Sequence, residues 1–232
     1  MTLPGKSNVK GSQGGEQSLP FYCVRRLTNH WARPLRGGSY YWFLTFEHQP
    51  QLQALVRRCQ RAISFPYYDL TPPADLHMTL ERIAFEEEIS PQQLDEVAKA
   101  GEKTCETIRP LEFAVEHLGG TSGAVGFNAY PREPIHDLRD RLRAATASAY
   151  PAARFRTGEF DPHITIAYCN AEVPAAQAVA TVKALNGSVS VKLAVVNVSL
   201  VLLTRLPRAY RWQSVSRLPL LGMECNANTP EP

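Results

Sequence analysis

Residues 72–85, PPADLHMTLERIAF, set a histidine and a threonine into an apolar run, two positions apart. On a β-strand, side chains at positions i and i+2 point to the same face, whereas on an α-helix they point in nearly opposite directions. A strand therefore places His77 and Thr79 together on one face. Met78 and Leu80 then occupy the other face. The stretch predicts a strand that buries an aliphatic face and presents an imidazole and a hydroxyl on its second face.

The same pattern occurs a second time in the chain. Residues 75–80 read DLHMTL, and residues 161–166 read DPHITI. Each copy has an aspartate two positions before the histidine and a threonine two positions after it. The separation between His77 and His163 is too long for a solenoid repeat. It fits a duplicated half-domain that forms two related lobes.

The rest of the chain indicates both strands and helices. Serine followed by proline at Ser90 is a strong helix start, because serine caps a helix N-terminus and proline suits its first turn. Strands occur in pairs rather than in strict alternation with helices, which favours an α+β fold with antiparallel sheets. Apolar periodicity predicts helices at residues 50–63, 90–108, 133–150 and 174–187, and strands within residues 39–46, 75–85, 111–131, 160–168 and 189–218.

Composition and charge are those of an ordinary soluble protein. The chain has 232 residues, of which 44% are hydrophobic and 20% charged, with a formal net charge of +3. This charge is too small to predict a nucleic-acid coat by itself. The N-terminal stretch has no apolar secretory signal, and the most apolar segment, residues 189–203, is too short and too polar to span a membrane. Five widely spaced cysteines disfavour a zinc site and a disulfide framework, so we expect a cytoplasmic protein with reduced thiols.

Three regions are expected along the chain. Residues 1–37 comprise a tail rich in glycine, serine and glutamine, followed by an arm that contains Trp31 and packs on the body. Residues 38–220 form a two-lobed domain, and residues 221–232 form a C-terminal tail.

Two histidines and two hydroxyls that face one groove suit acid–base chemistry at phosphorus. Imidazole has an ordinary pKa near 6.5, so a pair can hold one neutral and one protonated ring at working pH. The neutral ring accepts a proton from a nucleophile while the protonated ring gives one to a leaving group. The hydroxyls of Thr79 and Thr165 can donate to the phosphoryl oxygens between the rings. His77 and His163 are therefore the candidate catalytic pair.

Other uses of these residues leave weaker patterns. A metal site would add ligands at short spacing, but the next residues on the histidine face are Glu81 and Ala167, of which only the first is a ligand type. A serine hydrolase would need a motif such as G-x-S-x-G, which the sequence does not contain. The sequence has no P-loop and no dinucleotide-binding glycine motif either. A strand whose polar face meets solvent remains the alternative for either copy taken alone.

The motifs HMTL and HITI resemble the two H-x-T/S-aliphatic motifs of the 2H phosphoesterase superfamily, close to its 2′-5′ RNA ligase and cyclic phosphodiesterase branch. The resemblance covers residues 39–218. It implies a bilobal, pseudo-two-fold α+β fold with two antiparallel sheets and flanking helices around a central cleft. It also implies metal-independent chemistry, without a cofactor, on 2′,3′-cyclic phosphates or 2′-5′ linkages. His77 and His163 then match the catalytic pair, and Thr79 and Thr165 match the phosphate-binding hydroxyls.

Three further positions are candidate substrate-binding residues. Several relatives carry a basic residue five positions after the second histidine, where this chain has Tyr168, whereas the equivalent position after the first histidine holds Arg82. Phe127 falls in the strand that lines the cleft in relatives, where an aromatic ring can stack on a base. A place in the core is at least as compatible with this phenylalanine.

The resemblance implies an enzyme that opens a 2′,3′-cyclic phosphate on an RNA end or a nucleotide. The same residues also suit an ATP-independent 2′-5′ RNA ligase, because the reverse reaction uses the same groups. A nucleotide- or RNA-binding module that keeps the fold without turnover is a third alternative. The expected partner is RNA with a 2′,3′-cyclic phosphate end or a cyclic-phosphate nucleotide, and we expect a monomer that does not bind membranes.

Overall fold

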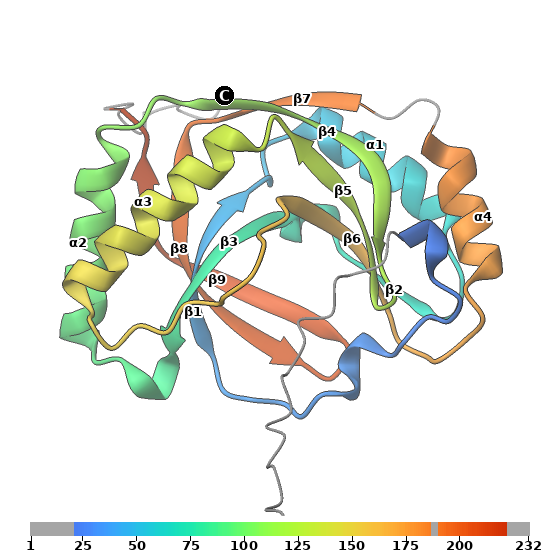
Figure 1. Ribbon diagram of the computed structural model, residues 1–232, viewed down its shortest axis with the longest axis horizontal. Coiled ribbons are helices and arrows are strands. Elements are labelled where there is room, and N and C mark those ends of the chain that lie inside the picture. The colour runs from blue at the N-terminus through green and yellow to red at the C-terminus, as the bar shows by residue number, and fades with distance from the viewer. Residues whose placement is uncertain (1–20, 187–189, 222–232) are drawn as a thin grey trace, which may run out of the picture.

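The computed structural model describes residues 21–186 and 190–221 (Figure 1). The tails expected at residues 1–20 and 222–232, and the predicted end of the fourth helix at residue 187, lie outside the described residues. The helices are α1 (Pro50–Ala62), α2 (Pro91–Cys105), α3 (Glu133–Ala149) and α4 (Ala176–Leu185). The strands are β1 (Ser39–Thr45), β2 (Tyr68–Leu70), β3 (His77–Phe85), β4 (Leu111–Thr121), β5 (Ala124–Tyr130), β6 (His163–Cys169), β7 (Ser190–Val195), β8 (Asn197–Leu206) and β9 (Ala209–Pro219).

The strands form two antiparallel sheets, which confirms the predicted α+β class. One sheet has the order β3-β1-β8-β9, and the other has the order β2-β6-β5-β4-β7. α2 and α3 pack against the first sheet, and α1 and α4 pack against the second. Figure 1 shows α2 and α3 on one side of the molecule and α1 and α4 on the other, with β3 and β6 between them. β3 and β6 contact each other, so the two histidine motifs meet where the lobes join.

The helices form where the sequence predicts them, for the predicted reasons. The Ser90 side chain accepts a hydrogen bond from the Gln93 backbone N–H, and Pro91 occupies the first turn of α2. The apolar face of α1 is buried, as is that of α3. Burial of these faces supplies most of the stabilisation, because isolated helices of this length are marginal in water. The strand β2 was not predicted, since three residues are too few to show a period.

An N-terminal arm, residues 21–37, runs across both lobes. We call the lobe with the sheet β2-β6-β5-β4-β7 the second lobe. The backbone of the arm hydrogen-bonds to it, because the Leu27 N–H donates to the Val173 carbonyl at 2.8 Å. The Trp31 indole N–H donates to Asp69 on β2 at 2.8 Å, and Arg205 on β8 donates to the Trp31 carbonyl at 2.6 Å. The arm therefore links a strand of each sheet.

No helix in the described part of the chain is long and apolar enough to cross a membrane.

Candidate active site

The two histidines are the first residues of β3 and β6, and their local geometry is the same. Nδ1 of His77 lies 2.8 Å from the Asp75 carbonyl oxygen, and Nδ1 of His163 lies 2.6 Å from the Asp161 carbonyl oxygen. A carbonyl oxygen only accepts, so each ring donates its Nδ1–H. Nε2 is then the nitrogen that each ring has free for proton transfer.

The shared aspartate of each motif also makes an ion pair. Asp75 pairs with Arg211 on β9 at 2.8 Å, and Asp161 pairs with Arg132 at 2.6 Å. These carboxylates are bound to arginines while their backbone carbonyls accept from the histidines. The aspartate in the repeated pattern therefore positions the imidazole through its carbonyl.

A β-bulge follows the threonine in the first motif. Thr79 pairs with Phe43 and Arg82 pairs with Tyr41, with a register shift between Phe43 and Trp42. Paired residues share a face of an antiparallel sheet, and one extra residue on a strand reverses the alternation beyond it. His77, Thr79 and Arg82 therefore share one face. The prediction that Glu81 lies on the histidine face is wrong, because the bulge turns it to the face covered by α3.

The second motif has a bulge at the equivalent place. Thr165 pairs with Gly126 and Tyr168 pairs with Ala124, with a register shift between them. Tyr168 thus joins His163 and Thr165 on one face. Ala167, which was predicted for that face, lies on the opposite one for the same reason as Glu81.

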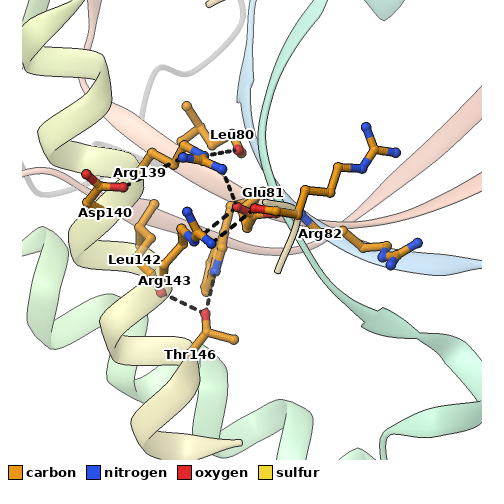
Figure 2. Close-up of polar contacts among 10 residues, drawn as sticks. Leu80, Glu81, Arg82, Arg139, Asp140, Leu142, Arg143 and Thr146 are labelled. Atoms are coloured by element: carbon orange, nitrogen blue, oxygen red, sulfur yellow. Dashed lines mark hydrogen bonds and ion pairs between the residues drawn. The ribbon is translucent and has the colours of Figure 1, made fainter. Parts of the chain in front are cut away.

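Buried charges hold the first bulge in place (Figure 2). Glu81 is 3% exposed, and its Oε2 lies 2.7 Å from Arg139 Nη2 and 3.3 Å from Arg143 Nε, both on α3. Arg139 Nε also donates to the Leu80 carbonyl at 3.1 Å, which satisfies a backbone group at the bulge. Figure 2 shows Arg82 extending away from the strand on the side opposite these two arginines. The ion pairs under β3 thus fix which residues share the strand face of His77.

The two imidazoles lie in different environments. His77 is half-buried and stacks on Phe43, with 4.3 Å between ring centroids and 5° between ring planes. Burial lowers the pKa of His77 to about 4; the Asp75 carbonyl opposes this shift, and the charge of His163 adds to it. His77 is therefore neutral at neutral pH. His163 is exposed and lines a hollow of about 330 Å³ with Thr165 and Asn128.

The sequence matches the family model of the 2′-5′ RNA ligase superfamily over residues 37–205. This match covers more than half of the chain and contains both histidine motifs. The chain belongs to the 2′-5′ RNA ligase superfamily. Comparison with curated proteins gives no match.

Solved structures share the fold. TT0787 of Thermus thermophilus superposes with a TM-score of 0.62 at 18% identity, covering 80% of this chain and 99% of that one. E. coli LigT complexed with 3′-AMP superposes with a TM-score of 0.58 at 15% identity, with the same coverage. LigT complexed with phosphate gives 0.54 at 15% identity, covering 78% of this chain and 96% of that one. These structural similarities confirm the predicted bilobal fold. The match to the superfamily model supports the same fold.

A glycine of β5 lies opposite the second threonine, at the second bulge. Gly126 pairs with Thr165 on the cleft face. A Cβ built on Gly126 would lie 2.6 Å from the Ile164 carbonyl oxygen, closer than such atoms approach. Only glycine therefore fits this close strand approach at the second bulge.

Phe127 is not available for base stacking, so of its two alternatives the place in the core is the correct one. It pairs with Ile164 on the face opposite His163, and it is 0% exposed. A side chain without accessible surface cannot stack on a substrate. Its role is to fill the core of the second lobe.

Aromatic residues of β9 and the arm also surround the site, and the sequence reasoning missed them. Trp212 is half-buried, and its ring centroid lies 6.3 Å from that of Phe43. Its indole nitrogen lies 3.5 Å from the Asp75 carbonyl oxygen. Tyr210 lies two residues earlier on β9, and its ring is 5.3 Å from that of Tyr168. Two aromatic residues at strand spacing were a signal for a functional face. Both lie beyond residue 205, where the family match ends.

Among the described residues, no three histidine, cysteine, aspartate or glutamate side chains gather so that they could hold a metal ion.

Proposed function

We propose that this superfamily member is a phosphodiesterase that opens 2′,3′-cyclic phosphates with His77 and His163 as its acid–base pair. The observation that carries the proposal is the duplicated geometry. In each lobe an aspartate carbonyl orients a histidine, a threonine hydroxyl lies on the same face, and a bulge brings the fifth residue to that face. A phosphodiester bound between the two histidine motifs has a proton acceptor on one side and a proton donor on the other.

The different environments of the rings suggest which is the base. Neutral His77 takes a proton from water at Nε2, and the water oxygen bonds to phosphorus. The bond from phosphorus to one ribose oxygen breaks, and protonated His163 gives its Nε2 proton to that oxygen. The product is a phosphomonoester with a free ribose hydroxyl, and the two rings exchange protonation states. A proton exchange with solvent restores them.

The remaining cleft groups suit the phosphate. The hydroxyls of Thr79 and Thr165 donate to its non-bridging oxygens, where negative charge is concentrated. Tyr168 lies on the same face of β6 as Thr165, where its hydroxyl can position that of the threonine. Arg82 supplies a cation on the first motif, in place of the basic residue that several relatives carry on the second. LigT has been crystallised with 3′-AMP and with phosphate, which supports an anionic nucleotide as the ligand of this fold.

The proposal is tested with a panel of substrates. Cyclic mononucleotides, an RNA end with a 2′,3′-cyclic phosphate, an ADP-ribose cyclic phosphate and a 2′-5′ oligoadenylate are incubated with the wild type and with His77→Ala and His163→Ala variants. Each variant should lose about 10²–10⁴-fold in kcat, the usual contribution of a general acid or base. The exposed His48 lies outside both motifs, so His48→Ala is the matched control and should retain activity.

Full activity in either motif variant would overturn the two-histidine mechanism. Loss of wild-type activity in EDTA would overturn its metal independence. Formation of joined RNA from two ends, without ATP and with no hydrolysis, would assign the ligase direction instead. Tight nucleotide binding without turnover of any substrate would indicate a binding module.

A further inference from the structure

A second hollow lies beside the active site, mainly between the arm and the β4–β5 hairpin. Its volume is about 940 Å³, within the range of small-molecule pockets. Most of its wall comes from arm residues before position 37, so it lies largely outside the superfamily match. We call it the arm pocket; the residues that matter most are Arg25, Arg26, His30, Arg33, Arg205 and Tyr210.

The arm pocket is strongly cationic. Four arginines line it against one carboxylate, the exposed Glu172, and none of the four makes an ion pair within residues 21–186 and 190–221. Burial lowers the pKa of His30 to about 4, and the charges of Arg205 and Arg33 add to this shift. One guanidinium group can donate two parallel hydrogen bonds to a phosphate. Arginines that line a hollow and make no ion pair therefore suit a phosphate ligand.

Arg205 is held in the wall of the arm pocket by two hydrogen bonds to the arm. Its Nη1 donates to the Pro34 carbonyl at 3.1 Å and its Nη2 to the Trp31 carbonyl at 2.6 Å. Its Nε is buried and has no hydrogen-bond partner among the described residues. The two bonds to the arm fix the guanidinium in place, so its positive charge is a permanent part of the pocket wall.

An aromatic path joins the arm pocket to the active site. Tyr210 forms part of the pocket wall, and Trp212 lies on the same face of β9, about 6.6 Å along the strand. Trp212 approaches the Asp75 carbonyl that orients His77. The ring of Tyr168 contacts that of Tyr210, and its side chain shares a strand face with Thr165. Aromatic rings stack on bases of any sequence, so this path suits a nucleic acid strand.

We propose that the arm pocket binds a phosphate, and the nucleotide that carries it, in an RNA strand whose cyclic end occupies the active site. The substrate is then a polynucleotide end rather than a mononucleotide. This inference rests on the proposed function, because it extends the same site.

The experiment compares kcat/KM for a cyclic-phosphate mononucleotide and for a short oligoribonucleotide with the same 2′,3′-cyclic end. The ratio of the oligonucleotide value to the mononucleotide value should fall at least about tenfold in Arg25→Ala/Arg33→Ala, because each charged contact contributes that order of affinity. Both arginines are exposed, so their truncation spares the fold. The salt dependence of oligonucleotide binding should also weaken, by about 0.7 in logarithmic slope for each phosphate that the variant no longer neutralises.

The matched control is Arg57→Ala/Arg61→Ala, which removes two exposed arginines of α1 outside the arm pocket. Unchanged melting temperatures show that both variants are folded. An unchanged ratio in the arm variant, or an equal fall in the α1 control, overturns the inference.

Failure of the proposed function is recognised separately. If the wild type turns over neither substrate, fluorescence anisotropy measures binding of a labelled oligoribonucleotide with a 3′-phosphate to the same three proteins. A Kd raised at least about tenfold only in the arm variant supports the pocket even then. Equal binding by all three proteins overturns it, as does equally effective competition by polyglutamate, which would mark a site for any acidic polymer.

Discussion

The proposed roles of His77 as base and His163 as acid depend on the environment of His77. Its ring is covered by Phe43 on one side, and its Nδ1–H is bound to the Asp75 carbonyl. We expect its imidazole to titrate well below 6.5, near pH 4, because burial disfavours the charged ring. NMR of the ring protons during a pH titration measures this. A midpoint near 6.5 would remove the reason for assigning His77 as the base.

Activity should follow the same ionisation. A base must be neutral to accept a proton, so kcat/KM should fall on the acid side with a midpoint near the low pKa of His77. The measurement is kcat/KM for a cyclic mononucleotide over a pH range that begins below the pKa of His77, which reports the free enzyme. An acid limb centred near 6.5 would point to a different base.

The proposed contact of the Tyr168 hydroxyl with Thr165 can be tested by removing one oxygen. We expect Tyr168→Phe to lower kcat/KM about three- to tenfold, since one neutral hydrogen bond contributes about 1 kcal/mol. Tyr150→Phe is the matched control, because the Tyr150 hydroxyl donates to the Glu88 carbonyl. Equal loss of activity in both variants would show a general effect on folding rather than on the site.

At the scale of elements, the bulge in β3 depends on the ion pairs beneath it. We expect Glu81→Gln to lower the free energy of unfolding by about 3–5 kcal/mol, because the buried Arg139 keeps only the longer contact with the exposed Asp140. Asp137→Asn removes the exposed pair with Arg141 on the same helix and should cost under about 0.5 kcal/mol. Urea denaturation measures both.

The same substitution should affect the active site. Release of the bulge changes the face of Arg82, so the refolded Glu81→Gln protein should lose activity more than Asp137→Asn does. A stable Glu81→Gln protein with full activity would show that the bulge forms without the ion pairs.

At the scale of the whole molecule, two half-buried histidines make stability depend on pH. Burial lowers the pKa values of His30 and His77 to about 4, and the charges of Arg205 and Arg33 add to the shift of His30. Between pH 6.5 and 4 the unfolded chain therefore binds more protons than the folded protein. Stability should fall as pH decreases through this window, by at most about 1.4 kcal/mol per pH unit for each histidine.

The arm histidine provides the test. We expect His30→Gln to make the decline shallower, because the glutamine takes up no proton in the unfolded chain. His48→Gln, at an exposed position, should keep the wild-type slope. Thermal or urea unfolding at several pH values measures the slopes, and identical slopes for His30→Gln and the wild type would contradict the expectation.

The sequence by itself determined the local features. Period-two and helical patterns predicted the helices, most strands and the strand face shared by His77 and Thr79, because these depend on neighbours along the chain. The antiparallel α+β class followed from the order of the elements. The duplicated motif indicated the superfamily before any contact was known.

Only the tertiary structure decided how the rest of the site is assembled. Strand alternation placed Glu81 and Ala167 on the wrong face, because a bulge depends on pairing with a distant strand and, at Glu81, on charges from α3. Only the strand pairing decided between the cleft and the core for Phe127. The aromatic path and the arm pocket join residues from opposite ends of the chain, and no local period records such contacts.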